Sequence, residues 1–410
     1  MKSWRYREGA KLSTTFEEIA IQAYGSADLA HIVRQANPQI IGNTVAEGAV
    51  IIVPDRTEPP EVEAPAEYPD EVAVIVAGKR FRFWTDVSIT RTLDSIDTVD
   101  IKGPFDASVA DMRKTFVPFS YRPLAVTVGG VRLFTGTMVS VTPDVSESAK
   151  TITISGYARA GVLADANPPV SALPVEFNKQ TLPDIAAKLC EPYGLRATFL
   201  ADAGGPFERV ACEPTQNILE FLTKLAQERG LVITNDTAGD LVFTRSESRP
   251  PVARLSQGSS PVMSVSVSFS PQNYFSHISG LEATEAGKTG GAYTVHNLHV
   301  LSQPRILNFD VTDADGPDLK TAVQAKAGRM MGNMASYTLE VAGWRTSEGK
   351  LWTPGDTVTL IAPDAMIYTE YPFLIRAVTL TRDADSLSAT LELAMPGAFN
   401  GEIPETLPWE

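Results

Sequence analysis

A chain of 410 residues is longer than one ordinary hydrophobic core can serve, so its length predicts two to four domains. A net charge of −14 and the lack of a Lys/Arg cluster with interleaved aromatic residues argue against nucleic acid as a specific partner. Frequent Gly and Pro, 29 of each, favour strands and turns over a helical bundle.

No export or anchoring segment is predicted. The opening MKSWRYREGAKLSTTFEE has no apolar signal-peptide core, and the longest apolar runs, such as Val72 to Ala77, have the length of a strand. We therefore expect no membrane partner. Cys190 and Cys212 lie in separate segments without a second Cys at ligand spacing, which predicts two buried thiols rather than a disulfide.

Residues 1–54 form the first predicted unit, with the order strand, helix, helix, strand. This order resembles a LysM module, and the resemblance is carried by the segments LSTTFEEIAIQAYG, ANP and EGAVIIVP. It implies a binding groove between two loops, made by Ser13, Thr14, Thr15, Ile40, Ile41, Gly42 and Asn43.

Residues 55–71 form a predicted linker, DRTEPPEVEAPAEYPDE, with four prolines and seven acidic residues against one arginine. Charge repulsion and proline stiffness favour an extended chain of ~3 Å per residue, or about 50 Å in all. We therefore expect the first unit to be tethered and not packed against the rest of the chain.

Residues 72–172 alternate apolar and polar side chains and predict a first small β-barrel. Gly129 and Gly130 form its predicted two-residue hairpin turn, because glycine adopts positive φ at both positions without strain.

Residues 173–250 alternate strand and helix and predict a small α/β domain. One helix is expected to begin with a capping box of Thr181 and Asp184. A second helix is expected to end at Gly230 and to bury one face, made by Ile218, Phe221, Leu222 and Leu225.

Residues 251–402 return to period-two patterns around one helix, near residues 318–334, and predict a second β-barrel; 403–410 form a tail. The predicted fold class is mainly β with α+β parts, in which two barrels are separated by an α/β unit. The two barrels are a candidate structural duplication, although their sequences do not align by eye.

Several segments, in order from residue 72 to 402, resemble the baseplate hub protein of Mu-like contractile-tailed bacteriophages. They are FVPFSYRPLAVTVGGVRLFTGT, SGYARAGVLADA, PTQNILEFLTKLAQERGLVITND, GDLVFTR, ADGPDLKTAVQAKAGRM and YTLEVAGWRTSEGKLWTPGDTVTL. The resemblance implies a non-enzymatic homotrimer, assembled in the host cytoplasm and located in the baseplate of the virion tail. Two barrels per subunit would give a near six-fold ring that joins the six-fold tail tube to the three-fold central spike.

The implied partners are therefore the tail tube protein, the central spike protein and baseplate wedge proteins. The Mu-like hub lacks a LysM module, so the partner of residues 1–54 is a separate question. LysM modules elsewhere bind N-acetylglucosamine polymers, which suggests peptidoglycan. In tail machines such modules clamp neighbouring proteins, and we favour this alternative because no hydrolase domain is readable.

Catalytic and metal sites are not predicted. The segment with Asp313, Asp315 and Gly316 begins like a calcium loop but lacks the bidentate Glu. His296 and His299 have no third ligand placed by any motif. No HExxH, G-x-S-x-G or positioned acidic pair supports the competing hypothesis of a wall-degrading protein, so we expect no enzyme activity and no cofactor.

Three aromatic residues, Phe134, Trp344 and Trp352, lie beside strand patterns. They are candidate anchors of a subunit interface, since aromatic residues are enriched there. Packing in the core of the subunit is an equal alternative.

Overall fold

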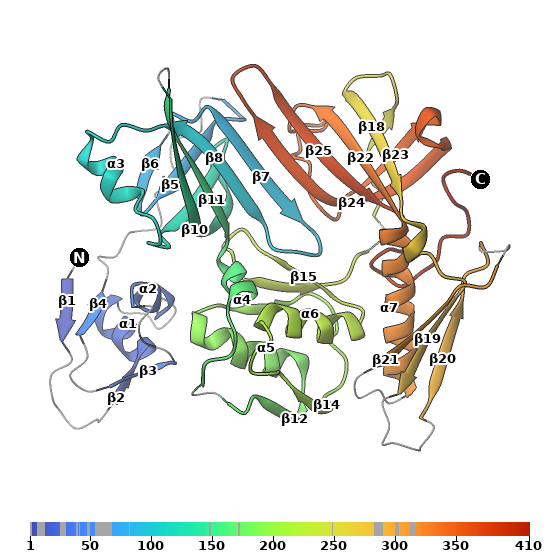
Figure 1. The fold of residues 1–410 in the computed structure, drawn as a ribbon, viewed down its shortest axis with the longest axis horizontal. Helices are drawn as coiled ribbons and strands as arrows, with labels where there is room; N and C mark the ends of the chain where they lie inside the picture. The colour runs from blue at the N-terminus through green and yellow to red at the C-terminus, as the bar shows by residue number, and fades with distance from the viewer. Residues whose placement is uncertain are drawn as a thin grey trace.

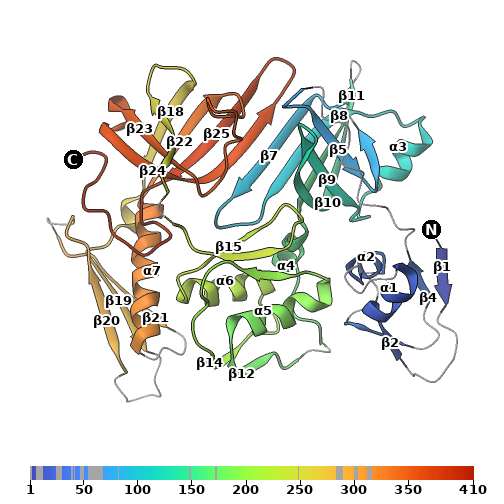
Figure 2. The ribbon, with the colours of Figure 1, turned by 180° about the vertical axis from the view of Figure 1, so that it is seen from behind.

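The computed structural model describes residues 2–5, 13–24, 30–37, 40, 42–46, 50–53, 68–81, 83–146, 149–170, 173–247, 249–282, 290–299, 303–311 and 316–410. Strands dominate this part of the chain, which confirms the predicted mainly β class with α+β parts. Two β units lie beside each other above an α/β unit, as Figure 1 shows from one side and Figure 2 from behind.

The first unit contains two small antiparallel ribbons and two helices. Its elements are β1 (Lys2–Arg5), β2 (Ser13–Thr15), α1 (Phe16–Tyr24), α2 (Ala30–Gln35), β3 (Thr44–Ala46) and β4 (Val50–Val53). β1 pairs with β4, and β2 pairs with β3. A separate small core holds them together, because Phe16, Ile19 and Val33 are buried with residues of the last two strands.

The first unit contacts the α/β unit, contrary to the expectation of a free tethered module. The Arg34 side chain is 8% exposed and lies over the Phe16 ring, 5.1 Å from its centroid. Its guanidinium donates to the carbonyl oxygens of Gly42 and Glu191. Of the predicted linker, residues 55–67 lie outside the described residues.

The first β unit follows from residue 72. Its elements are β5 (Val72–Val76), β6 (Lys79–Phe81), β7 (Asp86–Thr92), β8 (Thr98–Pro104), α3 (Ala110–Thr115), β9 (Pro123–Val128), β10 (Val131–Val145) and β11 (Lys150–Ala158). Gly129 and Gly130 both have positive φ, +59° and +77°, which confirms the predicted hairpin turn between β9 and β10.

The α/β unit begins with η2 (Arg159–Gly161) and α4 (Val162–Asp165). It continues with β12 (Glu176–Gln180), α5 (Leu182–Cys190), η4 (Glu191–Tyr193), β13 (Ala197–Phe199), β14 (Phe207–Ala211), α6 (Ile218–Glu228), β15 (Val232–Asn235) and β16 (Leu241–Thr244). The Thr181 and Asp184 capping box is present, as predicted. The apolar face predicted for α6 is buried, and Cys190 and Cys212 are buried free thiols, also as predicted.

The second β unit contains an insert between its strands β18 and β22. Its own elements are β17 (Pro251–Ser256), β18 (Val262–Phe269), β22 (Ala335–Ala342), β23 (Thr357–Ala362), η6 (Pro363–Ala365), β24 (Ile367–Arg382) and β25 (Leu387–Ala394). The insert contains η5 (Pro271–Asn273), β19 (His277–Glu282), β20 (Ala292–His296), β21 (Ile306–Val311) and α7 (Gly316–Met334). β19 to β21 form a separate sheet beside α7 (Figure 2), which is the predicted helix near residues 318–334.

The two β units repeat one strand order. The first runs β7-β8-β11-β10-β9-β5, and the second runs β18-β22-β25-β24-β23-β17. The two β units differ in the last strand pair of this order, because β5 lies antiparallel to β9 whereas β17 lies parallel to β23. The two units join through β7 and β24 into one sheet of 13 strands. Sequence patterns suggested the duplication, but not this shared sheet.

Candidate assembly interface

The junction between the two β units is a stretch of antiparallel sheet. Residues 87–92 of β7 lie opposite residues 377–382 of β24. Ile89 and Leu380, which face each other in this register, are both 0% exposed. The junction therefore buries apolar side chains as well as pairing backbone groups, which is how sheets are normally stabilised.

Polar contacts fix the same junction. The Thr90 and Thr379 hydroxyls lie 3.1 Å apart across the two strands. The Arg376 guanidinium contacts the Asp94 carboxylate, with Nε 3.2 Å from both oxygens and Nη2 2.9 Å from Oδ2. Because a fork of this kind is directional, it sets orientation as well as charge balance.

A buried carboxyl group connects the first β unit to the α/β unit. Asp97 is 3% exposed, and its carboxylate accepts from the Thr92 N–H at 2.9 Å and from Asn235 Nδ2 at 3.2 Å. The Asp97 N–H donates in turn to Asn235 Oδ1 at 2.7 Å. Burial raises the pKa of Asp97 to about 6, although the nearby Arg91 acts in the opposite direction.

The turn between β15 and β16 also docks on the first β unit. Gly239 has a φ of +84°, and a Cβ there would lie 2.2 Å from the carbonyl oxygen of Thr135. The Thr135 hydroxyl donates to the Thr237 carbonyl oxygen at 2.7 Å, and Arg159 pairs with Asp240 at 3.0 Å. The α/β unit therefore contacts β10 through backbone and is not held by a flexible hinge alone.

Two strand edges have no partner among the described residues. β18 pairs on one side only, with β22, and β10 beyond Met138 pairs on one side only, with β11. These edges carry exposed apolar side chains, since Met263, Phe269 and Val145 are 58%, 41% and 68% exposed. They lie on opposite sides of the β7–β24 junction (Figure 1).

The predicted groove of the first unit is partly visible. The structure places Ser13, Thr14 and Thr15 on β2, with Ile40, Gly42 and Asn43 before β3, whereas Ile41 lies outside the described residues. The two segments meet, because the N–H of Phe16 donates to the carbonyl oxygen of Asn43 at 3.3 Å. Asn43 Nδ2 lies 3.0 and 2.9 Å from the two carboxylate oxygens of Glu17, so the amide nitrogen is already engaged.

The three candidate anchors lie inside the subunit. Phe134, Trp344 and Trp352 are each 1% exposed and belong to the main core. Trp344 Nε1 donates to the carbonyl oxygens of Thr381 and Ser388, both at 3.0 Å. A contact with another subunit requires exposure, so the interface proposed below is built without these three side chains.

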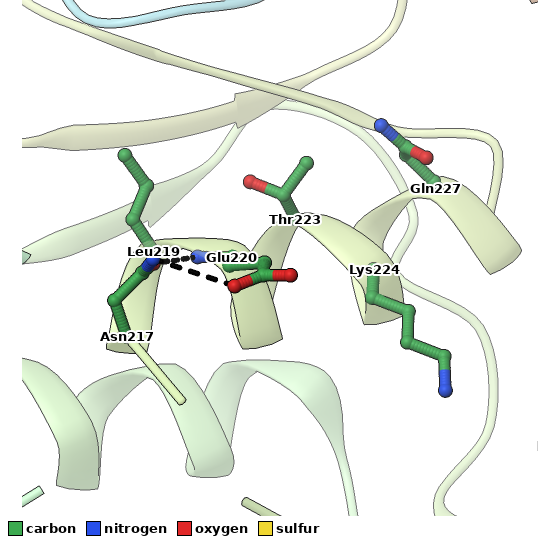
Figure 3. Close-up of a pocket in the computed structure, with 6 residues that line it drawn as sticks. All are labelled: Asn217, Leu219, Glu220, Thr223, Lys224 and Gln227. Carbon is green, nitrogen blue, oxygen red and sulfur yellow. Dashed lines mark hydrogen bonds between the residues drawn. The ribbon is translucent and has the colours of Figure 1, made fainter. Parts of the chain in front are cut away.

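A shallow depression on the outer face of α6 offers no catalytic arrangement. It is lined by Asn217, Leu219, Glu220, Thr223, Lys224 and Gln227 (Figure 3). Asn217 Oδ1 accepts from the Glu220 N–H at 2.7 Å, and the Glu220 carboxylate accepts from Asn217 Nδ2 at 3.4 Å (Figure 3). Both side chains therefore serve the start of the helix.

Metal ligands do not cluster in the part of the chain that the structure describes, where no group of three His, Cys, Asp or Glu side chains could hold an ion. The His296 ring meets the His277 ring edge to face, and His299 contacts Glu410 and the Pro404 carbonyl oxygen. Asp313 and Asp315 lie outside the described residues. No described helix has the length and apolar character needed to cross a membrane.

The residues that join the units were not found by sequence reasoning. Asp94 and Arg376 are 282 positions apart, and Asp97 and Asn235 are 138 apart. Charged or amide residues at strand ends are common, so no local pattern marks these four. The alternation VMSVSVSF in β18 was the one available signal of a half-buried edge.

Comparison with known proteins supports a structural role in a tail baseplate. A family model described as "Baseplate hub protein gp44-like, second domain" matches residues 160–245. The baseplate hub protein gp44 of Escherichia phage Mu is 24% identical over 341 residues, which cover 78% of this chain and 87% of that protein.

Solved structures show the same fold. The 43 kDa tail protein of prophage MuSo2 from Shewanella oneidensis has a TM-score of 0.68 and 26% identity, over 80% of this chain and 99% of that one. The tail protein from Neisseria meningitidis MC58 has a TM-score of 0.68 and 22% identity, over 82% and 99%. The chain is thus a relative of the gp44-like baseplate hub proteins and of the tail proteins of Mu-like phages.

Proposed function

We propose that this protein is the central hub of a contractile-tail baseplate and acts as a homotrimer. Six β units, two from each chain, form a near six-fold ring between the six-fold tail tube and the three-fold central spike. The observation that carries this proposal is the repeat of one strand order within a single chain. Its relatives among tail and hub proteins support the same setting.

The mechanism is symmetry matching through extended surfaces. A three-fold assembly of a chain with two similar β units presents six similar surfaces on one side, while the rest of the chain keeps three-fold symmetry. The junction held by Arg376 and Asp94 suits this role, because the two units of one chain must keep a constant relative position. Tail tube, central spike and baseplate wedge proteins are the proposed partners.

Light scattering of the purified chain tests the assembly. The expected mass is about 133 kDa, three times that of the 44.2 kDa chain. Co-purification with the tube and spike proteins of the same particle tests the partners, and a ternary complex is expected. A chain that stays monomeric and retains neither partner contradicts the proposed hub.

For the first unit we propose a clamp on a neighbouring baseplate protein. The proximity of β2 to residues 40–43 leaves peptidoglycan as the alternative ligand. Purified cell-wall sacculi incubated with the full chain separate the two: saturable retention at micromolar concentration supports the glycan, and its absence supports the clamp. Clearing of the cell wall in a zymogram contradicts a purely structural protein.

A further inference from the structure

The last six residues of the long strands β10 and β24 correspond one to one. Each pairs with the strand before it over its first part only. Each then has one bulged residue, Val139 in β10 and Arg376 in β24, before a run of six pairs with the following strand. Residues 140–145 of β10 therefore occupy the position of residues 377–382 of β24.

The strands β7 and β18 correspond in the same way. β7 lies beside β8, which pairs with β11 on its other side, and β18 lies beside β22, which pairs with β25 on its other side. Followed strand by strand, the pairing registers place Val267 of β18 at the position of Ile89 of β7. In the internal junction, β7 is the docking strand and β24 is the receiving strand. Each chain thus contains two docking strands, β7 and β18, and two receiving strands, β24 and β10.

Only one of the two receiving strands is occupied among the described residues. In β24 the receiving residues are covered by β7, and Leu380 is 0% exposed, as is Ile89 opposite it. The equivalent Pro143 of β10 is exposed, and the equivalent Val267 of β18 is half-buried. The open edge of β10 and the open edge of β18 are thus both available for pairing with another copy of the chain.

We infer that β18 of one subunit adds to β10 of the next, in the register that β7 and β24 use within each chain. Residues 265–269 lie antiparallel to residues 141–145, with Phe269 opposite Val141. This inference rests on the proposed trimeric hub and names the surface that closes it. The contact is head-to-tail, because the two edges lie on opposite sides of the β7–β24 junction, and three such contacts close the ring.

The register is favoured by the side chains. It gathers apolar residues on one face of the new ribbon, namely Val141, Pro143 and Val145 with Val265, Val267 and Phe269. It gathers polar residues on the other face, namely Thr142 and Asp144 with Ser266 and Ser268. A slip of one residue would place polar side chains opposite apolar ones throughout, which a half-buried ribbon disfavours.

The internal junction supplies a precedent for the polar face. Thr142 and Ser268 occupy the positions of Thr379 and Thr90, whose hydroxyls lie 3.1 Å apart. Pro143 has no N–H and removes one donor from the ladder between subunits. An edge proline of this kind, together with the charge of Asp144, also limits unselective strand pairing before assembly.

Disulfide trapping in the full chain tests the register. The double variant Thr142→Cys, Ser268→Cys places two thiols at directly opposed positions of neighbouring subunits, where cross-strand Cβ atoms are about 5 Å apart. Mild oxidation should yield covalent dimers and trimers on non-reducing gels. The native Cys190 and Cys212 are buried, so they leave the background low.

The matched control is Thr142→Cys, Ser264→Cys, which moves one thiol four residues, about 13 Å, along the same face. We expect at least tenfold less covalent trimer from this control. Equal trapping in both variants, or none in either, overturns the inference. The mass of the unmodified chain then separates two failures: a trimer keeps the proposed hub and rejects only this interface, whereas a monomer that binds no partner rejects both.

A charge swap provides a second test that needs no oxidation. Ser266→Asp sets a carboxylate opposite Asp144 of the neighbouring subunit and should raise the dissociation constant of the trimer at least tenfold. Adding Asp144→Lys should restore association, because the opposed charges then attract. Unchanged association in Ser266→Asp, or failure of the second substitution to restore it, contradicts the proposed pairing.

Discussion

The Arg345 guanidinium holds Asp70, with Nε 2.8 Å from the carboxylate Oδ1 and Nη2 2.8 Å from the Pro69 carbonyl oxygen. Arg382 Nη1 donates to the Asp70 carbonyl oxygen at 3.0 Å. Pro69 and Asp70 lie near the end of the acidic segment of residues 55–71, whereas both arginines belong to the second β unit. The point where the first β unit begins is therefore attached to the second.

Asp70→Ala should lower the free energy of unfolding by about 1 kcal/mol, because the Asp70 and Arg345 side chains are only about a quarter exposed and form a direct hydrogen bond. Urea titration followed by fluorescence measures the change. Asp111→Ala is the matched control, because Lys79 and Asp111 are 47% and 72% exposed and solvent screens their attraction, so the substitution should leave the free energy of unfolding unchanged. Equal losses in both variants would argue against a role for the Asp70 contact.

Asp97 should make stability depend on pH. Its folded pKa is about 6 and its ordinary value is 3.8, so between these values the folded chain retains a proton that the unfolded chain has lost. The Asp97 contribution is therefore most favourable below pH 4 and is lost as pH rises through 6. Relative to Asp97→Asn, the wild type should lose about 3 kcal/mol between pH 3.5 and 7. Urea titrations of both proteins across this range measure the difference, and parallel curves contradict the prediction.

Trp344→Phe should cost more stability than Trp352→Phe. Both indoles are 1% exposed, but Trp344 Nε1 donates to two carbonyl oxygens, whereas Trp352 Nε1 has no hydrogen-bond partner among the described residues. Loss of the Trp344 donor removes both of these hydrogen bonds, and we expect an extra cost of about 1–2 kcal/mol. Urea denaturation compares the two variants. A larger loss of unfolding free energy in Trp352→Phe than in Trp344→Phe contradicts the role given to the Trp344 hydrogen bonds.

Gly239→Ala should separate the α/β unit from the first β unit. A Cβ at Gly239 collides with the Thr135 carbonyl oxygen, so we expect a loss of about 3 kcal/mol or more. Gly258→Ala is the control, because its φ of +77° is similar but no atom lies within 4 Å of the added Cβ. Its cost should be about 1 kcal/mol, from the backbone alone. Differential scanning calorimetry measures both variants, and similar transitions in the two contradict the proposed collision.

Local features were predictable from the sequence because they depend on neighbouring residues. The Thr181 capping box, the Gly129–Gly130 turn and the buried face of α6 each lie within a few positions of the residues that specify them. The limits assigned to the domains and the LysM character of residues 1–54 stay predictions.

The mainly β class, the helices α5, α6 and α7 and the resemblance to a hub were all accessible from the sequence. How these parts are joined was not: the β7–β24 sheet, the fork of Arg376 on Asp94 and the burial of Asp97 emerged from the three-dimensional fold. The physical reason is that strand pairing and ion pairs connect residues hundreds of positions apart, and any period-two strand presents the same backbone groups to many possible partners. The correspondence of β10 with β24 became visible only in the strand-pairing registers. β7 covers the edge of β24, whereas the equivalent edge of β10 pairs with no described strand.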